Sequence, residues 1–120
     1  MSPEPCLIDV AALDAALQRF ADERDWQQYH SPKNLAMALT GEVGELVEIF
    51  QWLTEDQSKG VASDPRTARP VRDEIADVLL YLVRLSSVLG VDLNEAVEHK
   101  LRRNAEKYPA GISTPSKRRE

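Results

Sequence analysis

Two long stretches of this chain repeat apolar residues at helical spacing, and this feature limits the possible folds most strongly. In each stretch an apolar residue recurs every three or four positions, the spacing of one face of an α-helix. The two stripes consist of Leu35, Leu39, Val43, Leu46, Phe50 and Leu53 in the first stretch, and Val71, Ile75, Val78, Leu82, Leu85 and Leu89 in the second. We therefore expect two amphipathic helices that pack against each other as a central hairpin.

Start and stop signals divide the chain into four predicted helices. Ser31-Pro32 and Asp64-Pro65 each place proline directly after a capping side chain, as helix starts do, and a start after Pro70 is the alternative for the second of these helices. Gly90 is suited to end a helix. The predicted helices are 9–23, 31–53, 64–89 and 93–107, with a loop at 54–63 and a disordered tail at 110–120. Because no segment shows a strand pattern, we predict an all-α fold in a single domain, 1–120, whose core spans about 9–109.

Composition and charge exclude several classes of protein. A chain of 120 residues with 42% hydrophobic and 29% charged residues fits one globular domain. The net charge of −5 argues against binding to nucleic acid polymers, and no apolar run approaches the ~20 residues that cross a bilayer. The first residues lack a secretory pattern, and a single cysteine, Cys6, cannot form an internal disulfide. We therefore expect a cytoplasmic protein with no membrane partner.

Acidic residues interrupt both apolar stripes at matching positions. On a helical wheel of about 100° per residue, Glu42 falls inside the first stripe and Glu45 at its edge, whereas Glu48 points away. Glu74 falls inside the second stripe, and Asp77 lies at the same edge. A carboxylate pushed toward a core costs several kcal/mol unless a proton, a basic side chain or a cation compensates it. The four acids therefore predict a shared compensating group between the two helices.

A divalent cation is the compensation that the residue types favour. Neither stripe contains Lys or Arg, and Arg72 and Arg84 lie on other faces of their helix, although the last helix could lend Lys100. Carboxylate oxygens without a Cys or His cluster suit Mg²⁺, with Mn²⁺ as a substitute. Residues three apart on a helix are neighbours, so each acidic pair can reach a common ion. The residues alone thus predict a divalent-metal site and leave its substrate open.

The segments that carry these acids resemble a known family. GEVGELVE at 41–48, followed by DEIAD at 73–77, resembles the all-α NTP pyrophosphohydrolases of the MazG type. RDW at 24–26, YHSPKNL at 29–35, FQW at 50–52 and the segment 104–109 are similar to the dCTP pyrophosphatase branch of that family. Gly41 departs from the broader family, which has a glutamate there, and Leu17 departs from branch members with a polar side chain. The resemblance covers about 17–109.

The resemblance implies an activity, an assembly and a set of site residues. It implies hydrolysis of a nucleoside triphosphate to the monophosphate and pyrophosphate, as nucleotide-pool house-cleaning. It also implies a four-helix bundle that forms a dimer or a dimer-of-dimers tetramer with pockets at subunit boundaries. The implied residues are Glu42, Glu45, Glu74 and Asp77 for Mg²⁺, with Glu42 or Glu45 also activating the water; Trp26, His30, Trp52 and Tyr81 for the base; and Lys100, Asn104, Lys107 and Tyr108 for phosphate or sugar.

Alternative interpretations of the same residues stay open at this point. The acids could be structural metal ligands in a non-catalytic helical module that binds nucleotides or partner helices, or could be salt-bridged across an interface without any metal. The aromatic residues could pack in a core or interface, and the lysines could be solvated. Leu79, Leu80 and Val83 lie outside the stripe, and we expect them to be buried against another chain. Within the enzyme interpretation, cytosine and its 5-substituted forms are the first expectation for the base, and other pyrimidines or a broad specificity are the second.

Overall fold

The computed structural model describes residues 8–111, and every regular element in this range is helical. The elements are α1 (Val10–Glu23), the 3₁₀ helix η1 (Gln27–Tyr29), α2 (Pro32–Phe50), α3 (Glu55–Ser58), α4 (Ala68–Leu89) and α5 (Leu93–Lys107). The predicted all-α class is confirmed. The predicted number of helices is wrong, because the described residues form five α-helices. The predicted disordered tail lies, from residue 112 onward, outside the described residues.

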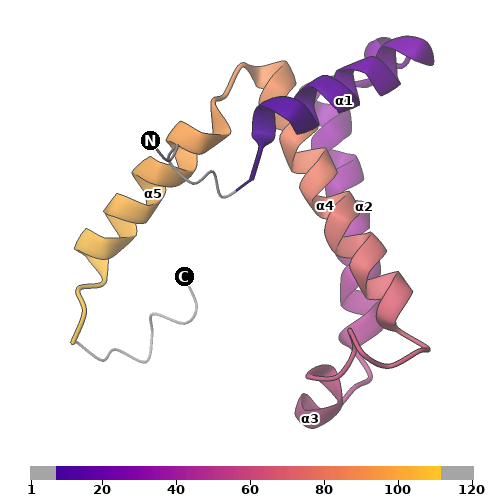
Figure 1. Ribbon diagram of the computed structural model, residues 1–120, viewed down its shortest axis with the longest axis vertical. Helices are drawn as coiled ribbons and strands as arrows, with labels where there is room; N and C mark the ends of the chain where they lie inside the picture. The colour runs from indigo at the N-terminus through magenta and orange to yellow at the C-terminus, as the bar shows by residue number, and fades with distance from the viewer. Residues whose placement is uncertain (1–7, 112–120) are drawn as a thin grey trace, which may run out of the picture.

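The centre of the molecule is a hairpin of α2 and α4, as the two apolar stripes predicted. The two helices lie side by side, α1 packs against α4, and α5 runs away from the hairpin after residue 90 (Figure 1). Leu35 of α2 and Val71 of α4 are each 2% exposed. The radius of gyration is 17.5 Å, whereas a compact domain of this length has ~14 Å. A single chain therefore forms an open arrangement in which α5 contributes no buried residue.

Helix caps explain where the long helices begin and end. The Ser31 hydroxyl accepts a hydrogen bond from the Asn34 amide at 3.1 Å, with Pro32 as the first helical residue, so the predicted start of α2 is confirmed. Asp92 caps α5 in the same way. Gly90 has φ of 71°, the left-handed conformation that glycine adopts most easily, and it ends α4 as predicted.

The segment between α2 and α4 differs from its prediction. α2 ends at Phe50 rather than residue 53, and the predicted loop at 54–63 contains α3. A capping box forms α3, because the Thr54 side chain accepts from the Gln57 amide and the Gln57 side chain accepts from the Thr54 amide. The predicted start of α4 at Asp64-Pro65 is also wrong. Asp64 instead accepts from the Arg66 amide and guanidinium, which forms a turn, and α4 begins at Ala68.

The apolar faces of α4 are covered differently from the prediction. Val83, which we expected to be buried against another chain, is 1% exposed within this chain, on the helix against which α1 packs. Members of the predicted core stripe remain open instead, since Ile75 is 56% and Leu89 55% exposed. The stripe of α4 is thus only partly covered by α2. None of the helices in residues 8–111 has the length and apolar composition needed to cross a membrane.

Candidate metal site and adjoining cavity

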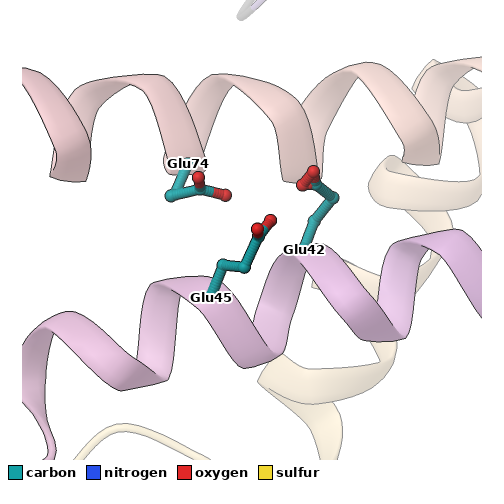
Figure 2. A group of neighbouring side chains, drawn as sticks. All are labelled: Glu42, Glu45 and Glu74. Carbon is teal, nitrogen blue, oxygen red and sulfur yellow. The ribbon is translucent and has the colours of Figure 1, made fainter.

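Three carboxylates meet between α2 and α4. Glu42 and Glu45 come from α2 and Glu74 from α4, and one oxygen of each lies within 4.8 Å of the others. Figure 2 shows the three side chains pointing toward one another from the facing helices. Glu42 and Glu74 are half-buried and Glu45 is exposed, as their positions within or at the edge of the stripes predicted. We refer to these three residues as the acidic group.

Burial and mutual repulsion disfavour the charged forms of these acids. Burial raises the pKa of Glu42 to about 7, helped by a hydrogen bond with Glu45 and by the charges of Glu45, Asp77 and Glu74. Burial also raises the pKa of Glu74, followed in importance by the charges of Glu45 and Asp77. The fourth predicted acid, Asp77, is therefore within electrostatic reach of the acidic group. It is half-buried and faces a neighbouring cavity.

The acidic group has the properties of a site for a hard divalent cation. Among the described residues, Oε2 of Glu42 and Oε2 of Glu74 are buried and have no hydrogen-bond partner. Buried carboxylate oxygens without donors are costly, and a cation supplies the missing partner to both. An all-oxygen donor set with charged carboxylates matches Mg²⁺, Mn²⁺ or Ca²⁺ and does not suit a thiolate-seeking metal. The residues present therefore fit a divalent metal.

A cavity of about 180 Å³ lies on the α1 side of the hairpin, and Asp77 connects it with the acidic group. Its walls are mostly apolar and aromatic, and the polar groups that reach it are few. Its lining residues are Leu17, Phe20, Trp26, His30, Leu35, Asp77, Leu80, Tyr81 and Arg84. Ligand pockets that enclose whole drug-sized molecules are ~300–1,000 Å³. A space of this size suits one ring of a ligand, with the remainder extending past Asp77 toward the acidic group.

A tight turn after α1 places the aromatic wall of this cavity. Asp25 has φ of 55°, the left-handed conformation, and the Trp26 amide donates to the Ala21 carbonyl at 2.9 Å. This Schellman-type ending reverses the chain immediately after the helix. Trp26 then packs edge-on against Phe20, with ring centroids 5.5 Å apart. The turn thereby brings Trp26 and, through η1, His30 back onto the hairpin.

The structure brings together only some of the predicted ligand-binding residues. Trp26, His30 and Tyr81 share the cavity with Asp77. Trp52 is 87% exposed and lines a separate hollow beside α3. The four residues predicted to bind phosphate or sugar lie on or directly after α5, away from the acidic group in this chain. Three of them, Lys100, Asn104 and Lys107, line one shallow hollow, and Tyr108 follows at the end of the helix.

Arg84 is the cavity residue that sequence analysis missed. It lies outside the apolar stripe of α4, yet it is only 5% exposed. Its Nε donates to His30 Nδ1 at 2.9 Å, and its Nη1 donates to Gln18 Oε1 at 2.7 Å. The available signal was its spacing, because Asp77, Tyr81 and Arg84 follow one another at intervals of four and three residues and share one side of a helix.

Comparison with known proteins identifies the class to which this hairpin and its acids belong. The family model described as the MazG-like family matches residues 38–116, which include the acidic group and Asp77. The chain belongs to the MazG-like family, and the resemblance to this family and its dCTP pyrophosphatase branch is confirmed.

Relatives and a solved structure agree with this assignment. The chain is 46% identical over 118 residues to the human protein dCTP pyrophosphatase 1, covering 98% of this chain and 68% of that protein. It is 45% identical over 115 residues to the mouse protein of the same name, covering 96% and 66% respectively. The chain thus spans about two thirds of the length of these relatives. A crystal structure of a pyrophosphatase from Archaeoglobus fulgidus matches with TM-score 0.78 and 40% identity, covering 90% of this chain and 99% of that one.

Proposed function

We propose that this protein is a Mg²⁺-dependent nucleoside triphosphate pyrophosphohydrolase that converts dCTP, or a 5-modified dCTP, to the monophosphate and pyrophosphate. The observation that carries the proposal is the acidic group together with Asp77, which is within electrostatic reach of that group and also lines a cavity of single-ring size. The relatives named dCTP pyrophosphatase support the choice of base and reaction. Nucleotide-pool house-cleaning is the role that follows from removing such triphosphates.

The chain's own residues divide the work of this reaction. Mg²⁺ would be held by Glu42, Glu45, Glu74 and Asp77. The bound ion would neutralise charge on the triphosphate and lower the pKa of water at the site. Either Glu42 or Glu45 accepts the proton of the attacking water and orients it toward the α-phosphorus. The new bond joins the water oxygen to the α-phosphorus, and the bond between that phosphorus and the bridging oxygen breaks. Pyrophosphate leaves with the electron pair of that bond.

Trp26 and Tyr81 form the walls against which the base packs. Both are aromatic and both line the cavity, and stacking of a base on such a ring contributes ~1–3 kcal/mol. The triphosphate then extends from the cavity past Asp77 to the acidic group. This path places the α-phosphate, rather than the γ-phosphate, next to the acids, because the α-phosphate is the one attached to the sugar.

We further propose that the functional form is a dimer or a dimer-built tetramer in which the four-helix bundle closes between chains. Large apolar side chains remain open on the helices of the hairpin and on α5; they include Met37, Val43, Val47, Ile75, Leu82, Leu89, Val97 and Leu101. Soluble single chains rarely expose so much apolar surface along the faces of packed helices. In this assembly the nucleotide held by one chain is contacted by residues of another chain, namely Trp52, Lys100, Asn104, Lys107 and Tyr108.

Product analysis tests the proposed reaction. The protein would be incubated with dCTP and Mg²⁺, and the products would be separated by ion-exchange chromatography. We expect dCMP and pyrophosphate from the wild type, and a loss of at least ~100-fold in Glu45→Ala and Asp77→Ala. Glu48→Ala is the matched control, because this exposed glutamate on α2 lies outside the acidic group. Absence of turnover with dCTP and a panel of other triphosphates, in a folded protein that binds Mg²⁺, would leave only the non-catalytic module.

Subunit complementation tests the proposed assembly. Glu45→Ala and Lys100→Ala would each be inactive alone, because each removes part of every site. A refolded equimolar mixture should regain about a quarter of wild-type activity in a symmetric dimer, since half of the dimers are mixed and each mixed dimer has one intact site. No recovery, with mixed dimers demonstrated by mass spectrometry, would place Lys100 and the acids of one site in the same chain.

A further inference from the structure

A chain of hydrogen bonds links α1 to the wall of the cavity through a buried arginine. Gln18 Nε2 donates to Asp22 Oδ1 at 2.8 Å, and Gln18 Oε1 accepts from Arg84 Nη1 at 2.7 Å. Arg84 Nε in turn donates to His30 Nδ1 at 2.9 Å. Gln27 also donates to Asp22. We call Asp22, Gln18, Arg84 and His30 the Arg84 relay.

The direction of every bond in the relay is set by its chemistry. The Asp22 carboxylate only accepts, so the Gln18 amide must turn its nitrogen toward Asp22 and its oxygen toward Arg84. A guanidinium remains protonated in proteins and offers only donors. His30 Nδ1 must therefore accept, which leaves the proton of the neutral imidazole on Nε2.

The surroundings of His30 favour this neutral form. Burial lowers the pKa of His30, and the positive charge of Arg84 lowers it further. The ring also meets Trp26 edge-on, with centroids 6.4 Å apart, and this contact restricts its rotation. His30 is thus a neutral ring in one tautomer, beside Trp26 and in the wall of the cavity that Tyr81 also lines.

Arg84 is buried beside the cavity although burial of a charged guanidinium is unfavourable. Arg84 is 5% exposed, and the ion pairs found within residues 8–111 do not include it. Its hydrogen-bond partners among the described residues are the neutral side chains of His30 and Gln18, so its charge is not offset by a contacting carboxylate. Burying a guanidinium in this way costs stability. The cost is understandable if Arg84 orders a group that contacts the ligand.

We propose that Arg84 is a positioning residue that fixes His30 as a hydrogen-bond donor through Nε2, so that the cavity selects a ring bearing a hydrogen-bond acceptor. The pyrimidine ring supplies such an acceptor in its carbonyl oxygen at position 2. The identity of the ligand as a base rests on the proposed function. The state of His30 does not, because the relay is complete in the protein without ligand.

Nitrogen NMR on the ligand-free protein tests the relay directly. The variant His99→Gln would remove the other histidine of the chain, so that the imidazole signals belong to His30 alone. Two-bond ¹⁵N–¹H correlation spectra show which ring nitrogen is protonated and whether the other accepts a hydrogen bond. We expect protonated Nε2 and a hydrogen-bonded Nδ1, a change of the Nδ1 signal in Arg84→Met, and its partial recovery in Arg84→Lys. A protonated Nδ1, or spectra that Arg84→Met leaves unchanged, would overturn the proposal.

Steady-state kinetics then separates positioning from a general structural role. Arg84→Met and His30→Leu should each raise KM for dCTP about tenfold with kcat changed less than about threefold, because the acidic group is untouched. His30→Gln, which keeps a donor near the place of Nε2, should retain most of the affinity. The double variant should be no worse than either single variant, since both remove one interaction. If the increases in KM of the two single variants were additive in the double variant, the coupling of Arg84 to His30 would be overturned. The expected NMR spectra together with an absence of dCTP turnover would refute only the proposed reaction.

Discussion

Replacing Glu42 with glutamine should stabilise the metal-free protein and remove its stabilisation by Mg²⁺. The substitution deletes one charge from a group whose oxygens lie within 4.8 Å of one another. At this separation two unit charges repel by ~0.9 kcal/mol in water and by ~3.5 kcal/mol at an effective dielectric constant of 20. Above the pKa of Glu42, about 7, we therefore expect the free energy of unfolding of the metal-free variant to rise by ~1–3 kcal/mol.

The pH dependence of stability follows from the same group. Because the folded protein raises the pKa of Glu42 from an ordinary value near 4.5 to about 7, the native state holds this proton across a range in which the unfolded state has lost it. Stability in EDTA should therefore fall as pH rises from 4.5 to 7, and remain low above that range. Glu42→Gln should flatten this part of the profile. This change of stability with pH is opposite in sign to the change that a salt-bridged carboxylate causes, because a salt bridge lowers the pKa of the carboxylate in the folded protein.

Thermal unfolding followed by circular dichroism, at one protein concentration, measures both effects. A gain of ~1 kcal/mol corresponds to about 3–6 °C in Tm for a domain of this size. Mg²⁺ at 100 times its Kd should stabilise the wild type by ~2.7 kcal/mol and the variant much less. Glu48→Gln controls for a simple change in net charge. If Glu42→Gln lowered Tm in EDTA, repulsion among the charges of the acidic group would be refuted. If the variant gained as much from Mg²⁺ as the wild type, the acidic group would not be the metal site.

The other predictions concern packing, the turn after α1 and the metal itself. Leu35→Ala should lower the free energy of unfolding in urea by ~2–5 kcal/mol, because Leu35 of α2 is 2% exposed. Met37→Ala, at a residue 66% exposed, should lower it far less, and equal losses would contradict the described core. Asp25→Gly should keep or slightly raise Tm, and Asp25→Val should lower it, because φ at this residue is 55°; equal Tm values would show that the turn does not need this conformation. EDTA should abolish dCTP hydrolysis, and Mg²⁺ or Mn²⁺ should restore it while Ca²⁺ restores much less; activity that persists in EDTA would exclude the metal role of the acids.

The hairpin and its acids were predictable because each depends on a local pattern. The period of the stripes forces α2 and α4 together, and an acid inside a stripe then has to face the other helix. Glu42 and Glu74 illustrate this, since their wheel positions alone predicted that they would meet. The helix start at Ser31 and the helix end at Gly90 were also predictable, because capping interactions lie within one turn of the helix.

Features set by contacts between distant segments were not predictable in the same way. Arg84 is buried because α1 and the turn after it cover its side of α4, and no local pattern of α4 reports that cover. The short helix α3 was missed although its capping box was present, because four residues are too few to show helical periodicity. Local pattern predicted the bounds of α5, 93–107, but the helix contributes no buried residue in this chain, so the sequence could not place it against the hairpin.

Hydrolysis in water enriched with ¹⁸O tests the central claim most directly. The reaction would be run with dCTP and Mg²⁺, and the masses of the products would be measured by mass spectrometry. If water attacks the α-phosphorus beside Glu42, Glu45, Glu74 and Asp77, one ¹⁸O atom appears in dCMP and none in pyrophosphate, and Glu45→Gln suppresses both products. Label in pyrophosphate would mean attack at the β-phosphorus, and release of dCDP with labelled phosphate would mean attack at the γ-phosphorus. Either result would contradict the proposed placement of the triphosphate.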